Sequence, residues 1–188
     1  MNIIVTDSKA EQFHFRPDST LVKDSSHFYM PSFLDGLAVS FGYAFRIEKP
    51  AKGVSSKYSS RYINKYTEGI LLYGVLDDTP PINSYRTNET CFDNSTYIVN
   101  QMKDLCDTTL SFDRSLSLLC DGKEYFPQEK FPNLETIAGI MLEKFSTQFS
   151  FKTRDIIFVE CAYAHSITTP CDIKLFANHT PVLEFKVK

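Results

Sequence analysis

The residues best suited to chemistry in this sequence are Cys161 and His165, which stand four positions apart. A cysteine thiolate is a nucleophile and a nearby imidazole can take its proton, so the pair could support covalent catalysis. Glu160 precedes the cysteine directly, and its negative charge would oppose thiolate formation. A catalytic dyad also needs contact in space, which sequence spacing does not establish. We therefore expect Cys161 to be a small core residue and His165 a loop histidine.

The cysteines as a group indicate neither a zinc site nor a disulfide framework. Their number is odd, and no two of them form a Cys-x-x-Cys pair. Reduced and mostly buried thiols are therefore expected. The five residues are Cys91, Cys106, Cys120, Cys161 and Cys171.

Carboxylates are scarce between Gly36 and Leu76, where two acidic residues stand against six basic ones. This stretch has a net charge of +4, whereas the whole chain has −3. A hard cation such as Mg²⁺ needs oxygen ligands, usually including carboxylates, so no metal site can come from this stretch alone. The pI of about 5.8 and the singly spread glycines argue against nucleic-acid binding and against a phosphate loop.

A strict alternation of large and small side chains from Leu37 to Ile47 predicts a β-strand. The large apolar side chains share one parity and should face a core. The opposite parity is small until Arg46, and its small residues are Ala38, Ser40, Gly42 and Ala44.

The remaining patterns predict a β-rich α+β fold with two helices. Helical spacing marks residues 55–66 and residues 134–149, the second with an Asn133 cap. Strands are expected over 156–161, 173–177 and 182–187, with a hairpin turn at Asp121-Gly122. Residues 77–94 are expected to form a long surface loop, in which Tyr85 and Arg86 could contact an anion.

Length and composition fit a single domain over residues 1–188. With 43% hydrophobic residues, the chain can bury a substantial core. No run of about 18 apolar residues is present, and residues 1–7 lack the features of a signal peptide. We therefore expect a cytoplasmic protein that does not enter a membrane.

A series of short motifs resembles the fumarylacetoacetate hydrolase family, and their order along nearly the whole chain carries the resemblance. It implies a multilayer β-sheet roll and a homodimer. The 16 Phe and 10 Tyr residues fit an apolar interface between subunits. The motifs are Phe15-Arg16-Pro17-Asp18, Glu68-Gly69-Ile70, Phe92-Asp93, Cys120-Asp121-Gly122-Lys123 and Arg154-Asp155-Ile156-Ile157-Phe158.

The departures from the family fall on its chemistry. The resemblance places a pair of metal-binding glutamates at Ser40 and Gly42 and an aspartate at Leu71, and none of these residues offers a carboxylate. The family's Gly-Thr-Pro loop appears as Glu160-Cys161-Ala162. The resemblance therefore implies no metal and no other cofactor in this chain.

Two functions follow from this comparison. The favoured one is a degenerate, non-catalytic member that keeps the scaffold and binds a small acidic metabolite or a partner. The alternative is a divergent hydrolase or decarboxylase that acts on acylpyruvate or β-dicarbonyl substrates through Cys161, His165, Glu160 or Lys23. The first is favoured because the family's catalysis depends on a metal that polarises a carbonyl group.

Overall fold

Two β-sheets and two α-helices form the part of the protein that the computed structural model describes, which is residues 1–22, 26–76, 87–105, 116–127, 133–162 and 165–188. Strands dominate the fold, and the predicted β-rich α+β class is confirmed.

The larger sheet is built on two long antiparallel strands, β4 (Gly36–Arg46) and β5 (Lys65–Val75), which pair along their whole length. Its order is β2-β1-β10-β4-β5-β6, with β11 paired to β4 and β7 paired to β5. The other strands are β1 (Asn2–Thr6), β2 (Phe13–Pro17), β6 (Thr96–Ile98), β7 (Lys103–Asp104), β10 (Ile156–Glu160) and β11 (His165–Ile167).

This sheet curls until its two ends meet. Beyond β2, Leu21 forms a bridge to Thr96 of β6, and Val22 N donates to Thr96 O over 2.9 Å. The strands therefore enclose a narrow roll with an apolar interior of its own. The residues of this inner cluster are Ile3, Val5, Ala38, Ala44, Leu71, Tyr73, Ile156 and Phe158.

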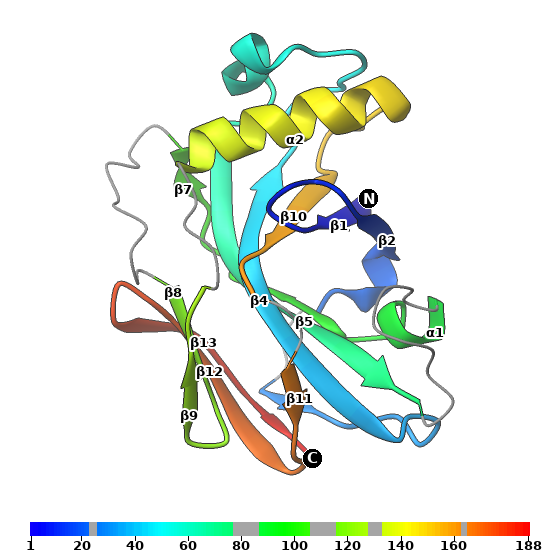
Figure 1. The fold of residues 1–188 in the computed structure, drawn as a ribbon, viewed down its shortest axis with the longest axis vertical. Helices are drawn as coiled ribbons and strands as arrows, with labels where there is room; N and C mark the ends of the chain where they lie inside the picture. The colour runs from blue at the N-terminus through cyan, green and yellow to red at the C-terminus, as the bar shows by residue number, and fades with distance from the viewer. Residues whose placement is uncertain (23–25, 77–86, 106–115, 128–132, 163–164) are drawn as a thin grey trace.

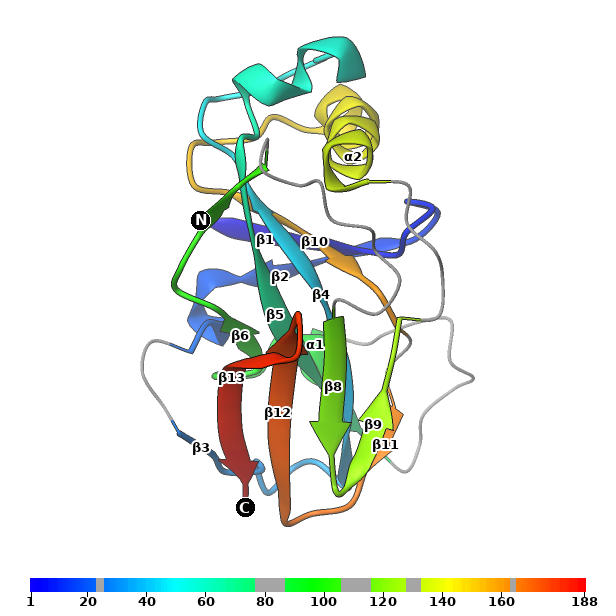
Figure 2. The same cartoon turned by 90° about the vertical axis from the view of Figure 1, so that its left-hand side faces the viewer.

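The outer face of the roll supports the main core. Helix α2 (Leu134–Gln148) lies across one end of β4 and β5, and the smaller sheet packs toward the other end (Figures 1 and 2). The large residues of β4, such as Val39 and Phe41, face this core as predicted. The smaller sheet has the order β3-β13-β12-β8-β9. Its strands are β3 (His27–Phe28), β8 (Leu116–Cys120), β9 (Lys123–Tyr125), β12 (Cys171–Ala177) and β13 (Thr180–Val187).

Helix α2 and the turn of the β8–β9 hairpin match their sequence signals. Asn133 Oδ1 accepts a hydrogen bond from Thr136 N over 2.6 Å and caps the helix, whose apolar stripe is buried. At Asp121 and Gly122 the φ angles are 52° and 73°, as the predicted hairpin turn requires.

Two local predictions were wrong. Residues 55–66 form only a short 3₁₀ helix, Ser56–Arg61, because β5 already begins at Lys65 and pairs with β4. Helix α1 (Thr87–Thr90) interrupts the expected loop, of which residues 77–86 lie outside the described part. None of the described helices is both long enough and apolar enough to cross a membrane.

Candidate functional site

Ser40, Gly42 and Leu71, to which the resemblance assigns the metal ligands, lie together inside the roll. Ser40 and Leu71 are opposite each other in the β4–β5 register, and Gly42 is opposite Glu160 of β10. Ser40 and Leu71 are fully buried. Pairing of neighbouring strands therefore makes one site from positions that are distant in the sequence.

Gly42 has no room for a side chain. A Cβ at this position would lie 2.0 Å from Val159 O, so a glutamate would require β10 to move. A Cβ at Gly69, which is opposite, would lie 2.8 Å from Phe158 Cε2. The small face of β4 is thus explained by tight packing inside a closed roll.

Arg16 of β2 is a fully buried cation in the roll interior. Its Nη2 donates to Leu72 O over 3.0 Å, and its Nη1 donates to Ser95 O over 3.1 Å. The guanidinium carbon lies 4.5 Å from the centroid of the Tyr73 ring. These contacts offset part of the lost hydration of the charge, while Arg16 Nε has no hydrogen-bond partner among the described residues.

Ser40, Tyr73 and Glu160 form a hydrogen-bonded group that we call the Glu160 cluster. The Tyr73 hydroxyl donates to Glu160 Oε1 over 2.8 Å, and Ser40 also hydrogen-bonds the carboxyl group. The Ser40 hydroxyl has one hydrogen, which it donates to Ala162 O over 2.9 Å. The Ser40 hydroxyl thus joins the carboxyl group of Glu160 to the backbone at Ala162.

The surroundings of Glu160 shift the pKa of its carboxyl group in both directions, and the net shift is upward. Burial raises the pKa of Glu160, and the charge of Asp7 adds to the shift. The hydrogen bonds of Ser40 and Tyr73 and the charge of Arg16 oppose it. A carboxyl group with a raised pKa is a candidate general acid.

His14 of β2 lies against the same tyrosine. Its ring meets the Tyr73 ring edge-on, with 5.9 Å between centroids. Burial and the charge of Arg16 lower the pKa of His14 from 6.5 to about 3. The imidazole is therefore neutral near pH 7, and it adds a third titratable group to the Tyr73 ring and the Glu160 carboxyl.

Cys161 is buried in the main core, on the outer face of the roll, as the sequence predicts. Its thiol donates to Val159 O over 4.0 Å. Burial and the adjacent Glu160 charge raise the pKa of Cys161 well above its ordinary value. These surroundings disfavour the thiolate that a nucleophile needs.

His165 is the first residue of β11 rather than a loop residue, because it pairs with Val39 of β4. Its ring stacks on Tyr125 with 4.5 Å between centroids. Burial and the charge of Lys123 lower its pKa. Within the described part of the chain, no hydrogen bond joins His165 to Cys161.

Three other sequence candidates, Lys23, Tyr85 and Arg86, lie outside the described residues. Conversely, sequence reasoning missed Arg16, His14 and Tyr73 as members of a site. The alternation in β2 held a signal, since Phe13 and Phe15 are exposed while His14 and Arg16 take the opposite parity. In the sequence, the parity of His14 and Arg16 is typical of a solvent-facing side. In the structure, the closure of the roll places it in the interior.

The donors at the assigned metal positions do not fit a hard divalent cation. Ser40, Gly42 and Leu71 contribute one hydroxyl group between them, and Glu160 is the carboxyl group beside them. Across the described ranges, no group of three or more His, Cys, Asp or Glu side chains could hold a metal ion. Mg²⁺ prefers several oxygen ligands with carboxylate charge, which this arrangement lacks.

No protein-family model and no curated protein matches the chain. Solved structures do resemble it along its whole length. One is a protein assigned to the fumarylacetoacetate hydrolase family from Yersinia pestis CO92, with a TM-score of 0.73 and 14% identity over 100% of this chain and 92% of that chain.

Two structures of named enzymes are similar as well. A 5-carboxymethyl-2-hydroxymuconate delta-isomerase from Mycobacterium smegmatis has a TM-score of 0.74 and 14% identity over 99% of this chain and 78% of that chain. A maleylpyruvate hydrolase from Sphingobium sp. SYK-6 has a TM-score of 0.73 and 12% identity over 99% and 70%. At such identities the likeness establishes the fold alone. The chain has the fold of the fumarylacetoacetate hydrolase family.

Proposed function

We propose that this protein is a degenerate, non-catalytic member of the fumarylacetoacetate hydrolase fold that serves as a scaffold for a ligand or a partner. The observation that carries the proposal is the backbone of β10 at Gly42, where Val159 O occupies the place of a side-chain Cβ. A carboxylate ligand cannot be added there without displacing a strand. Metal polarisation of a carbonyl contributes several kcal/mol to catalysis of this type.

The interior packing supports the same proposal. Leu71 and Phe158 belong to the apolar cluster inside the roll, Leu71 is opposite Ser40, and Arg16 adds a fixed positive charge. A buried guanidinium group would repel a divalent cation. A small acidic metabolite is the ligand class we propose, bound by a cytoplasmic, single-domain homodimer that has no nucleic-acid or membrane partner.

The Glu160 cluster favours a second candidate, a hydrolase or decarboxylase that acts on acylpyruvate or β-dicarbonyl substrates without the family's ligand set. When it is protonated, Glu160 beside the Tyr73 hydroxyl can donate a proton to a carbonyl oxygen, which is the role of a general acid, and its raised pKa favours that form. In this candidate Glu160 carries the chemistry, while Cys161 is too deeply buried to act as a nucleophile.

Calorimetric titration with Mg²⁺ and Mn²⁺, combined with assays of acylpyruvate hydrolysis and oxaloacetate decarboxylation, tests both candidates. The scaffold proposal expects no micromolar metal binding and no turnover above buffer with either metal. Metal-dependent turnover would overturn it. Metal-independent turnover that Glu160→Gln abolishes and Cys161→Ala retains would establish the second candidate.

A further inference from the structure

A pair of stacked rings connects the margins of the two sheets. Tyr125 is the last residue of β9 and His165 is the first residue of β11, and their ring centroids lie 4.5 Å apart with 27° between the ring planes. β9 is the edge strand of the smaller sheet, whereas β11 pairs with β4 of the larger sheet (Figure 2). The stack therefore joins two strands that belong to different sheets.

Strand parity turns both rings toward the space between the sheets. Tyr125 is opposite Leu118 of β8, which belongs to the main core. His165 is opposite Val39 of β4, which belongs to the same core. Lys123 shares the parity of Tyr125, and its Nζ lies 5.1 Å from the centroid of the Tyr125 ring. The ring on which His165 stacks thus already carries a cation.

A proton on His165 would find no favourable surroundings. Its Nε2 atom is buried and makes no hydrogen bond in the part of the chain that the structure describes. An imidazolium donates from both ring nitrogens, so Nε2 would become a buried donor without an acceptor. The new charge would also repel Lys123. In agreement, burial and the charge of Lys123 lower the pKa of His165.

The other charged residues of these strands do not offset that repulsion. Glu124 has the opposite parity to Lys123, and it is paired with Leu119 on the outer face of the smaller sheet. Asp121 is exposed in the hairpin turn. Lys123 is therefore the charge that acts on His165.

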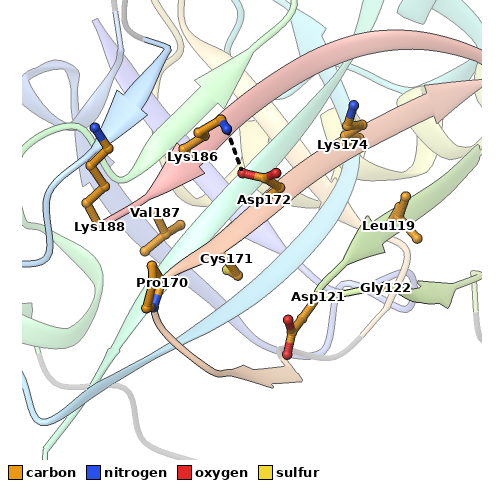
Figure 3. A pocket seen from close by; sticks show the side chains of 10 residues that line it. All are labelled: Leu119, Asp121, Gly122, Pro170, Cys171, Asp172, Lys174, Lys186, Val187 and Lys188. Atoms are coloured by element: carbon orange, nitrogen blue, oxygen red, sulfur yellow. Dashed lines mark ion pairs between the residues drawn. The ribbon is translucent and has the colours of Figure 1, made fainter.

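Both strands of the stack lead to a surface cavity of about 590 Å³ (Figure 3). Asp121 and Gly122, which come directly before β9, line this cavity. Pro170 lines it as well, and it follows closely on the end of β11 at Ile167. A movement of either strand would therefore change the shape of the cavity.

We propose that the Tyr125–His165 stack is an acid-sensitive clasp between the two sheets, closed while His165 is neutral and opened when His165 binds a proton. Opening frees β9 and β11, which are only three residues long, and reshapes the cavity. The closed clasp has its full stability above the ordinary histidine pKa of 6.5, and it loses stability as the pH falls below that value. The clasp lies between the sheets, apart from the Glu160 cluster inside the roll.

Hydrogen–deuterium exchange of the full-length protein at about pH 7.5 and about pH 5, corrected for the intrinsic effect of pH on exchange, tests the clasp. Peptides that cover β9 and β11 should open up to about 30-fold more at the lower pH, which is the limit for an imidazole with an ordinary pKa in the open state. Helix α2 should keep its protection. Unchanged protection of β9 and β11, or an equal loss in α2, would overturn the clasp.

Three variants assign the effect to its residues. H165F keeps an aromatic ring against Tyr125 and binds no proton, so β9 and β11 should lose their response to pH. K123M removes the repelling charge, so the response should weaken and the pKa of His165, measured by NMR titration, should rise. H27F is the matched control, because His27 stacks on Tyr29 at the opposite edge of the smaller sheet, and it should respond as the wild type does.

Circular dichroism of each variant confirms that the fold is retained. A wild-type response in H165F would refute the role of His165 in the clasp. An unchanged response in K123M would refute the role of Lys123.

Discussion

The Tyr73 hydroxyl donates a 2.8 Å hydrogen bond to Glu160 Oε1, while the guanidinium group of Arg16 lies on the ring of the same tyrosine. Tyr73 thus links the buried cation of Arg16 to the carboxyl group of Glu160. This relationship connects β2, β5 and β10, three strands that come from distant parts of the chain.

Replacing Tyr73 by phenylalanine should lower the free energy of unfolding by about 1–2 kcal/mol, because the buried carboxyl oxygen loses its donor. Urea denaturation measures the change. Tyr29→Phe is the matched control, since Tyr29 is 69% exposed and the change should be close to zero. In a double-mutant cycle with Glu160→Gln, a coupling energy within error of zero would contradict the bond.

Acidification should destabilise the protein through His14. Its pKa falls from 6.5 in the unfolded chain to about 3 in the folded protein, so the unfolded state binds the proton more tightly. The stability that the neutral imidazole provides is complete above pH 6.5, and it is lost as the pH falls toward 3. The slope should approach about 1.4 kcal/mol per pH unit.

His14→Gln should remove this slope of the unfolding free energy against pH. Denaturation curves at several pH values between about 7 and about 4 measure the slope. Glu160 acts in the opposite sense, because its raised pKa favours the folded state at low pH. Glu160→Gln should therefore steepen the acid loss. His179→Gln, in an exposed turn, is the control, and an unchanged slope in His14→Gln would count against the buried imidazole.

Gly42→Ala should destabilise the protein by more than about 3 kcal/mol, because the new Cβ would lie 2.0 Å from Val159 O. Gly36→Ala on the same strand is the matched control. Its Cβ would meet Val75 Cβ at 3.6 Å, an ordinary contact, so the change should stay within about 1 kcal/mol. Thermal melting compares the two variants, and similar melting temperatures would contradict the close approach of β10.

The protein should assemble as a homodimer. Several large apolar side chains are exposed on the single chain, including Tyr29, Phe33 and Phe15. Burying such groups between two copies lowers the free energy of the assembly. Multi-angle light scattering should report twice the chain mass of 21.5 kDa. A clean monomer at tens of micromolar would rule the dimer out.

The sequence by itself determined the local features of this fold. The alternation over residues 37–47 placed Val39 and Phe41 in the main core, and the Asn133 cap marked the start of α2. These signals are local, because side-chain parity in a strand and capping in a helix depend on neighbouring residues. The order of the motifs along the chain likewise predicted the fold that the solved structures share.

Only the tertiary structure decided what the small face of β4 contacts. The small side chains of Ala38 and Ser40 would fit either an empty pocket or a tightly packed interior. The bridge from Leu21, beyond β2, to Thr96 of β6 closes the roll, and this face then becomes part of a packed interior. That closure joins residues far apart in the chain, so no local pattern encodes it. The same long-range pairing buries Arg16 against Tyr73, and the pairing of β8 with β12 brings Cys120 beside Cys171.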